Sequence, residues 1–269
     1  KQFLQKQFNE KDGVLVKCDP VQVFCGNNTA NGNPDLKWMG ADSANYYNSY
    51  DVKSDHGWGE LMELIEKINF DFDNLGDILN IDRVLWAFAV NSAILNLDTY
   101  NGYYVHNYYL YRTEDGLFQM IPWDFDNSFA GAILGWDFFD PMAVYNYDTY
   151  GNQYAPNERP LLEKLLDDPY YKKLYNAHLR TVYIESLMDT DAVRASINQL
   201  QATAYTAVVQ DENKLFSMGQ YSSNVEENLW TGWGFGGIMS MINGRNAYLS
   251  GLQTMFMPTP EISNMNLNG

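Results

Sequence analysis

Residues 81–96 constrain the fold most, because apolar side chains occupy nearly every face of the helix that this segment predicts. A helix that is hydrophobic all round either lies at the centre of a protein or spans a membrane. Its longest uninterrupted apolar run, from residue 84 to residue 90, falls far short of the roughly 18 residues that a membrane span requires. We therefore expect a central, buried helix and no transmembrane segment.

Apolar residues at three- and four-residue spacings predict further helices on both sides of this segment. Upstream, the pattern begins at Trp58 and includes Leu61, Leu64 and Ile65. Downstream, the expected helices cover residues 161–166, 170–188, 191–209 and 238–256. The sequence thus predicts a mainly helical body around the buried helix.

Two short runs rich in β-forming residues follow the buried helix, at residues 107–112 and 118–122. The turn Thr113-Glu114-Asp115-Gly116 joins them and is typical of a hairpin. Together with the helices, this hairpin predicts an α+β fold that is mostly helical.

Changes in composition along the chain divide it into three expected parts. Residues 1–57 read as a partial, β-rich N-terminal region, residues 58–257 as a helical lobe and residues 258–269 as a linker tail. The chain does not begin with Met, so we expect an excerpt of a longer protein that carries appended domains. Cys18 and Cys25 are expected to form a disulfide or to remain free thiols, since their spacing does not suit a zinc site.

The charge of the chain limits its partners. Its 269 residues include 34 acidic and 17 basic ones, which gives a net charge of −17. Such a chain repels a phosphate backbone, so we do not expect nucleic acid as a partner. With 46% hydrophobic residues, it has enough apolar surface to order itself, which excludes wholesale disorder.

Three polar residues follow the buried helix in a fixed order. Asp98 lies in the next loop, Asn107 at the mouth of the hairpin and Asp124 just past its second strand, so the hairpin should bring Asn107 and Asp124 side by side. Phosphoryl transfer needs an acidic group that orients the attacking hydroxyl, and oxygen ligands from an Asn and an Asp that hold Mg²⁺. Protein kinases have the same order, with closer spacing and with Gly in place of Asp126.

The motifs around these residues resemble the spore coat protein H (CotH) kinase family. They are the loop that contains Asp98, His106-Asn107-Tyr108-Tyr109-Leu110-Tyr111 and Ile121-Pro122-Trp123-Asp124-Phe125-Asp126. Upstream, residues 35–40, 50–54 and 58–61 are also similar to stretches of that family. The resemblance is good over residues 35–129 and weaker over the C-terminal helices.

The resemblance implies a protein-kinase-like C-terminal lobe and an atypical kinase that uses ATP with Mg²⁺ or Mn²⁺ to phosphorylate Ser or Thr of a protein. It also implies a secreted, cell-surface or spore-coat location. Asp98 would be the catalytic residue and Asp124 would bind the metal and hence the nucleotide. The hairpin geometry adds Asn107 as a second ligand, and Asp126 is a further candidate.

The family carries an upstream nucleotide-binding region that has no recognisable counterpart in this sequence. Lys17 and Lys53 are the nearest upstream lysines, and neither is predicted to bind phosphate. We therefore expect a lobe that can hold metal but lacks the clamp that positions ATP, and the sequence leaves open whether this piece of chain transfers phosphate by itself.

Other interpretations of the same residues stay open. Tyr-rich runs could line an aromatic groove of a noncatalytic surface or cell-wall module that binds protein or glycan. Two carboxylates could also serve a glycosidase, although the Asp124-Phe125-Asp126 spacing does not give the required separation across a sugar. Asp98 alone could satisfy loop backbone groups. His106 is interpreted as a hydrogen-bonded structural histidine.

Overall fold

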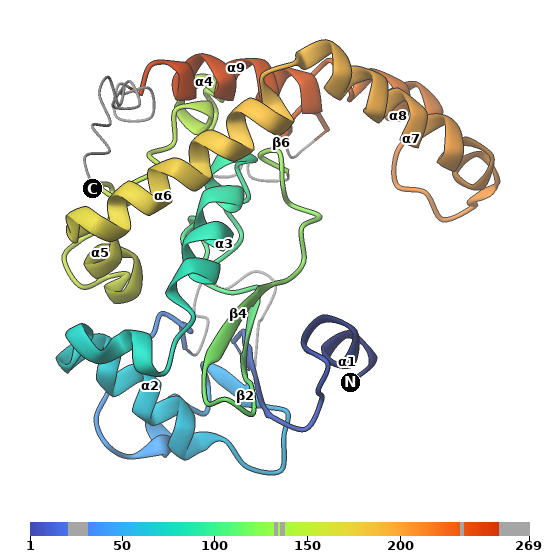
Figure 1. Ribbon diagram of the computed structural model, residues 1–269. Helices are drawn as coiled ribbons and strands as arrows, with labels where there is room; N and C mark the ends of the chain where they lie inside the picture. The colour runs from blue at the N-terminus through green and yellow to red at the C-terminus, as the bar shows by residue number, and fades with distance from the viewer. Residues whose placement is uncertain (21–31, 132–133, 135–137, 232–233, 253–269) are drawn as a thin grey trace, which may run out of the picture.

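The computed structural model describes residues 1–20, 32–131, 134, 138–231 and 234–252. A four-stranded antiparallel sheet, in the order β2-β1-β3-β4, forms one end of the molecule (Figure 1). The strands are β1 (Val14–Cys18), β2 (Tyr50–Val52), β3 (Tyr108–Arg112) and β4 (Phe118–Pro122). Tyr108 pairs with Pro122 and Arg112 with Phe118, which confirms the predicted hairpin.

The buried helix is α3 (Ile81–Ala93), and α6 (Pro169–Val182) packs along it (Figure 1). Nine of the 13 residues of α3 are buried, as its sequence predicts. The other helices of the described chain are α1 (Gln2–Phe8), α2 (Trp58–Phe70), α4 (Pro141–Tyr145), α5 (Pro160–Asp167), α7 (Thr190–Gln210), α8 (Met218–Ser223) and α9 (Ile238–Ser250). Helices around one hairpin-centred sheet confirm the mainly helical α+β fold.

Short elements complete the architecture. Two 3₁₀ helices, η1 (Ser43–Tyr46) and η2 (Phe72–Asp77), flank α2, and a π-helical turn, η3 (Tyr183–Leu187), continues α6. Two-residue strands β5 (Leu229–Trp230) and β6 (Gly234–Phe235) form a separate ribbon.

Each face of the sheet is covered differently. Val16, Leu110 and Met120 face the main core with α3, whereas Tyr111 and Ile121 face a small cluster with Leu4 of α1. The helix α1 was not expected from the sequence, which predicted only β-rich elements over residues 1–57. Because β1 lies between β2 and β3, that segment shares one sheet with the hairpin. The proposed boundary at residues 57 and 58 stays a prediction.

Three helix ends differ from those expected. The helix predicted over 81–96 stops at Ala93, because Leu95 adopts a left-handed φ of 50° inside a buried loop. The helix predicted over 170–188 changes to a π-helical turn after Val182. The last helix ends at Ser250, and the expected linker over 258–269 lies outside the described residues, as does Cys25. Cys18 is a buried free thiol at the end of β1.

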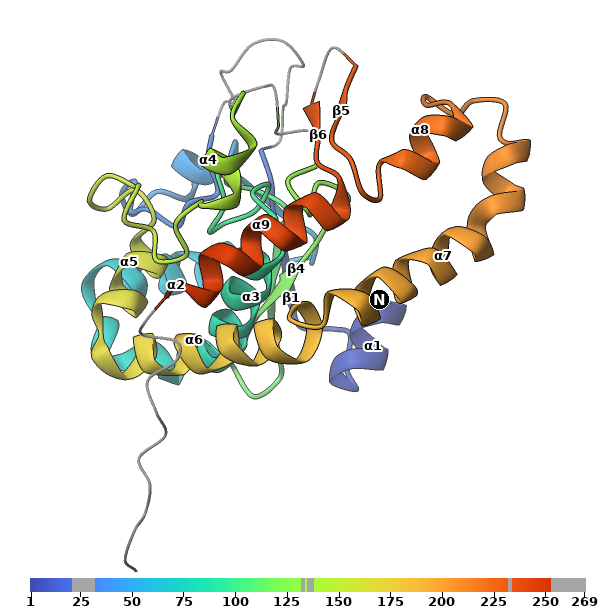
Figure 2. The same ribbon diagram turned by 90° about the horizontal axis from the view of Figure 1, so that it is seen from above.

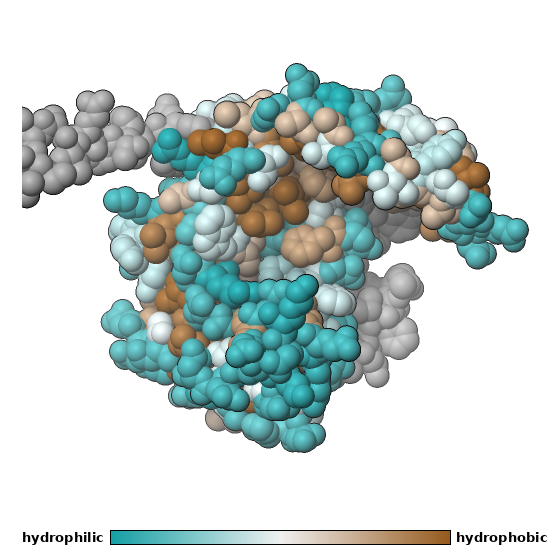
Figure 3. Space-filling model, turned by 45° about the vertical axis from the view of Figure 1, so that its right-hand side comes forward, coloured by the Kyte–Doolittle hydropathy of each residue, from teal (hydrophilic) through white to brown (hydrophobic). Residues whose placement is uncertain are grey.

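The helices α7 and α8 project from the body as an arm (Figure 2). None of the 21 residues of α7 is buried. Polar side chains cover the end of the molecule around the sheet, and apolar side chains gather nearer to the arm (Figure 3). Within the described chain, no helix combines the length and apolar character that crossing a membrane requires.

Candidate functional site

The loop that carries Asp98 follows α3 and folds against its own start. The Tyr104 N–H donates to the Leu97 carbonyl oxygen at 2.9 Å, and the Gly102 N–H donates to the Thr99 carbonyl oxygen at 2.9 Å. A Cβ atom on Gly102 would lie 2.3 Å from the Leu97 carbonyl oxygen, so this close approach requires glycine. The tight turn holds Asp98 in a defined position.

Buried asparagine side chains fasten the same loop to α3. Asn96 Nδ2 donates to Asn91 Oδ1 at 3.1 Å, and Asn91 Nδ2 donates to Asn101 Oδ1 at 3.3 Å. Asn101 Nδ2 donates in turn to the Phe88 carbonyl oxygen and to the Ser92 hydroxyl oxygen, each at 3.1 Å. Because a satisfied polar network in a core specifies one arrangement, these bonds fix the loop relative to the helix.

Asn107 and Asp124 lie at the open end of the β3–β4 hairpin. The Trp123 N–H donates to the Asn107 carbonyl oxygen at 3.0 Å, one step beyond the pair formed by Tyr108 and Pro122. Asn107 and Asp124 both have left-handed backbones, with φ of 57° and 56°. Asn and Asp tolerate this conformation better than most residues, so the ladder can end abruptly here. The hairpin thus joins two of the predicted site residues.

The Asp98 carboxylate is held by three side chains. Asn107 Nδ2 donates to Asp98 Oδ2 at 3.1 Å, and Asn127 Nδ2 donates to the same oxygen at 3.0 Å. His106 Nε2 lies against the other oxygen, Oδ1. Oδ2 already accepts two hydrogen bonds, whereas Oδ1 has one hydrogen-bond partner, His106. Oδ1 is therefore the oxygen better able to accept a hydrogen bond from a substrate hydroxyl.

Negative charge accumulates around Asp124. Burial raises the pKa of this carboxyl, and the charge and hydrogen bond of Asp126 and the charge of Asp98 raise it further, against a lowering effect of His106. A cation would relieve this repulsion. The carboxylate oxygens of Asp124 and Asp126 and the amide oxygen of Asn107 belong to the ligand class that Mg²⁺ prefers.

The described residues contain no cluster of three or more His, Cys, Asp or Glu side chains that could enclose a metal. Mg²⁺ commonly binds through one or two carboxylates together with substrate phosphates and water. Asp124 with Asn107 or Asp126 therefore suits a metal that arrives with a nucleotide better than a permanently enclosed ion.

A family model described as CotH kinase protein matches residues 1–229. The chain belongs to this family. It is also 28% identical, over 138 residues, to the inner spore coat protein H of Bacillus subtilis (strain 168). That match covers 51% of this chain and 34% of the relative, so the matched part spans about a third of the relative's length.

In this CotH family chain, His106 is hydrogen-bonded, as the sequence predicts, and one of its partners is Asp98. Its Nε2 contacts Asp98, and its Nδ1 lies 3.3 Å from Asp19 Oδ1. Ionised carboxylates only accept hydrogen bonds, so a ring that serves both must carry a proton on each nitrogen. Burial lowers the pKa of His106, but the hydrogen bonds and charges of Asp19 and Asp98 outweigh it and raise the pKa to about 9.

Asp19 follows β1 and links His106 to a lysine. Lys17 Nζ bonds to Asp19 Oδ2, which raises the pKa of Lys17 despite its partial burial. Burial raises the pKa of Asp19, whereas the hydrogen bonds from His106 and Lys17 outweigh it and lower the pKa overall. Lys53 forms a separate pair with Asp51. The two upstream lysines are therefore both engaged with carboxylates.

Exposed aromatic side chains stand next to these charges. Trp123 is 52% exposed and Phe125 is 42% exposed, on either side of Asp124 in sequence. Trp123 packs edge-on against Tyr109 at a centroid distance of 5.6 Å. Their exposure is consistent with contact to a ligand or a protein, but it does not distinguish a kinase from the aromatic binding module that the sequence left open.

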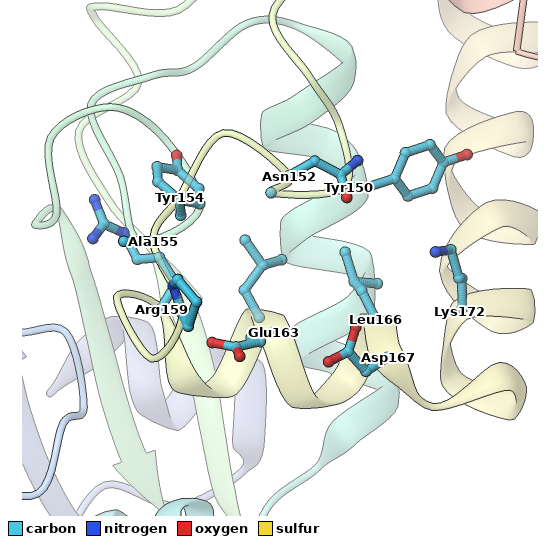
Figure 4. A pocket seen from close by; sticks show the side chains of 12 residues that line it. Tyr150, Asn152, Tyr154, Ala155, Arg159, Glu163, Leu166, Asp167 and Lys172 are labelled. Atoms are coloured by element: carbon cyan, nitrogen blue, oxygen red, sulfur yellow. The ribbon is translucent and has the colours of Figure 1, made fainter.

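A separate pocket of about 250 Å³ is lined by α5 and the segment before it, together with Lys172 of α6 (Figure 4). Its lining includes Tyr154, whose hydroxyl donates to the Gly102 carbonyl oxygen at 2.7 Å, and Arg159, whose Nε donates to the Tyr100 carbonyl oxygen at 3.1 Å. None of the predicted site residues lines this pocket. Tyr154 and Arg159 therefore stabilise the loop that follows Asp98 through hydrogen bonds to its backbone.

The sequence analysis missed three contributors to this geometry: Asp19, Asn127 and the placement of His106 beside Asp98. Local signals existed for two of them, since His106 precedes Asn107 and Asn127 lies three residues after Asp124. Asp19 had no such signal. It reaches the site only because Cys18 pairs with Tyr108 across the sheet.

Proposed function

We propose that this chain is an atypical protein kinase that transfers the γ-phosphate of ATP to Ser or Thr of a protein, with Mg²⁺ or Mn²⁺. One observation carries the proposal. Asn107 donates its side-chain amide to Asp98 while its carbonyl oxygen accepts the N–H of Trp123, the residue before Asp124. Asn107 therefore connects Asp98, which would orient the attacking hydroxyl, to the segment that carries Asp124, which would bind the metal. Membership of the CotH kinase family adds support.

Asp98 is assigned to the hydroxyl of the protein substrate. Its side chain is 14% exposed, and its Oδ1 retains acceptor capacity beside His106. A carboxylate in this role accepts the proton of the substrate hydroxyl and orients its oxygen for in-line attack on the γ-phosphate. Asn107 and Asn127 fix the carboxylate through Oδ2, which keeps Oδ1 in one direction.

Asp124 is assigned to the metal, with Asn107 as second ligand and Asp126 as a further candidate. A bound Mg²⁺ ion would supply positive charge to the phosphate oxygens during transfer. Asp124 contributes an oxygen ligand at the end of β4, and its raised pKa means that protons and metal compete for the same carboxylate. Asp124 and Asn107 both have a left-handed backbone, which fixes where their side chains leave the end of the hairpin.

We also propose a protein acceptor outside the cytoplasm, at the cell or spore surface. The named relative is an inner spore coat protein, which supports the coat as one such location. The net charge of −17 favours an acceptor that is not itself strongly acidic.

The first test is calorimetric titration of ATP with Mg²⁺ or Mn²⁺ into the chain. Metal-dependent binding is expected, and Asp124→Asn should weaken it by about 10- to 100-fold because it removes a charged ligand. Asp55→Asn, at an exposed position outside the site, is the matched control and should bind as the unchanged chain does. Metal-independent binding, or equal affinity in all three proteins, would contradict the assignment of Asp124.

The second test measures transfer of labelled phosphate from ATP to myelin basic protein, a basic acceptor, followed by phosphoamino-acid analysis. Label on Ser or Thr is expected, with loss of transfer but not of ATP binding in Asp98→Asn. A chain that binds no nucleotide and transfers no phosphate, yet binds coat or wall polymers, would support the noncatalytic module instead.

A further inference from the structure

His106 bridges two carboxylates that approach it from different parts of the fold. Its Nε2 contacts Asp98 in the loop after α3, and its Nδ1 lies 3.3 Å from Asp19, the residue after β1. The side chains are 25%, 14% and 19% exposed for His106, Asp98 and Asp19. Asp19, His106 and Asp98 are thus partly buried and joined by hydrogen bonds into a chain that ends at the proposed catalytic residue, Asp98.

The order of strands explains why Asp19 reaches this place. β1 runs antiparallel to β3, and Cys18 pairs with Tyr108, so the residue that leaves β1 meets the residues that enter β3. His106 lies in that entering segment. Lys17, two residues back on β1, holds the second oxygen of Asp19. Asp19 is therefore fixed from one side by Lys17 and from the other by His106.

We propose that His106 and Asp19 act as a positioning pair for Asp98, with His106 fixing the direction of the Asp98 carboxylate and Asp19 fixing the ring of His106. The inference rests on the proposed kinase function and extends it with two residues that contact neither substrate nor metal. Asp19 orients the imidazole through Nδ1, so that Nε2 remains directed at Asp98 Oδ1. Substitution of a residue that orients a functional side chain in this way commonly lowers activity by about 10- to 100-fold.

A purely structural role for the pair is the competing explanation. His106 and Asp19 could simply join β1 to the segment before β3, in which case substitutions would reduce stability and leave turnover unchanged. The chain contains a matched pair for this comparison, because His178 Nε2 lies 2.8 Å from Asp82 Oδ1 between α6 and α3, remote from Asp98 in sequence.

The test is steady-state phosphoryl transfer to myelin basic protein, with KM and kcat measured separately. His106→Gln can hydrogen-bond Asp98 but cannot bridge both carboxylates, and kcat should fall about 10- to 100-fold with KM for ATP changed less than about threefold. Asp19→Ala should act in the same direction. Asp19→Asn keeps an acceptor for Nδ1–H and should recover most of kcat.

The control variant His178→Gln should leave kcat unchanged. The positioning role is overturned if Asp19→Ala and His106→Gln retain the original kcat, or if their losses follow thermal unfolding at the assay temperature. An equal loss in Asp19→Asn and Asp19→Ala would also count against it, because the hydrogen bond to Nδ1 would then be irrelevant.

A measurement that needs no catalysis separates this inference from the proposed function. In protein labelled with ¹⁵N-histidine, NMR spectra resolve the ring signals of His106, and the Nδ1 signal should be altered in Asp19→Ala and the Nε2 signal in Asp98→Asn. These signals in a chain that transfers no phosphate would contradict the kinase proposal and keep the bridge. Transfer without them would contradict the bridge and keep the kinase.

Discussion

Arg245 and Asp98 are both charged groups held by hydrogen bonds, yet the protein surrounds them in opposite ways. Arg245, on α9, is completely buried. Its Nε and Nη2 donate to the Ser92 carbonyl oxygen at 3.0 and 2.7 Å, and its Nη1 donates to the carbonyl oxygens of Tyr145 and Tyr147. Among the described residues, each of these hydrogen-bond acceptors is a backbone oxygen without net charge, and the guanidinium also lies over the Tyr248 ring at 4.7 Å.

Asp98 instead lies among other charges and retains some exposure. Its partners are side chains, one of them the cationic ring of His106, and it repels Asp124. Arg245 has neutral hydrogen-bond partners that join α9, α3 and the end of α4. Asp98 is 14% exposed and lies near the negative charge of Asp124, surroundings that suit its proposed role.

Arg245→Met should have the largest effect of the changes considered, and the effect should be on stability. The substitution removes the donors of three carbonyl oxygens, and a buried acceptor left without its donor costs about 1–3 kcal/mol of unfolding free energy for each group. Urea denaturation measures this loss. Arg194, on the surface with Glu226, is the matched control, and Arg194→Met should lower the unfolding free energy far less, because exposed ion pairs contribute little. Equal stability of the two variants would show that the carbonyl oxygens find other donors.

Asp98→Asn should have the opposite effect to Arg245→Met: phosphoryl transfer should be lost and stability largely kept. An amide can still accept hydrogen bonds from Asn107 and Asn127, but it cannot take the proton of a hydroxyl, so transfer should fall by about 10²- to 10⁴-fold. Calorimetric ATP affinity should change less than about twofold and unfolding free energy by about 1–2 kcal/mol. A variant that unfolds as readily as Arg245→Met would place Asp98 among the structural charges.

The pH dependence of stability should report the ring of His106. Its pKa is raised from 6.5 to about 9 in the folded chain, so the folded state holds the proton more tightly than the unfolded state. The resulting stabilisation is fully present below about pH 6.5 and is lost as pH rises to about 9, and it amounts to about 1–3 kcal/mol. Urea unfolding between pH 6 and pH 10 measures it, and His106→Gln should flatten the profile over this window. An unchanged slope in that variant would mean that other groups titrate there.

Local patterns predicted the hairpin and the longer helices but not the short helices α1, α4 and α8, because periodicity needs several turns to become visible. The order of Asp98, Asn107 and Asp124 was also visible, since the hairpin makes a long-range contact out of a short sequence separation. Asp19 was not predictable in this way. Its approach to His106 depends on β1 pairing with β3 across 87 residues of sequence, and a single sequence does not encode that pairing locally.

Arg245 escaped prediction for a related reason. Its partners, Ser92, Tyr145 and Tyr147, are backbone carbonyl groups about 100 or more residues away, and carbonyl groups leave no residue-type signature. An Arg in a helix without strong amphipathic pattern resembles an ordinary surface residue. The buried asparagines around Asp98 are similar, since Asn91 and Asn101 become a network only once the loop has folded onto α3.

Asp126→Asn should have the smallest effect, and it tests whether the charge around Asp124 or a further ligand matters more. Asp126 raises the pKa of Asp124 by its charge and its hydrogen bond, so the amide should lower that pKa and let the metal compete with protons at lower pH. Calorimetric titration of ATP and Mg²⁺ from pH 4.5 to pH 7 should show half-maximal binding shifted to lower pH, with affinity at pH 7 changed by no more than about threefold, since Mg²⁺ needs only one or two carboxylates. A loss at pH 7 as large as that of Asp124→Asn would instead make Asp126 a direct ligand, and the site would then hold its metal through both carboxylates.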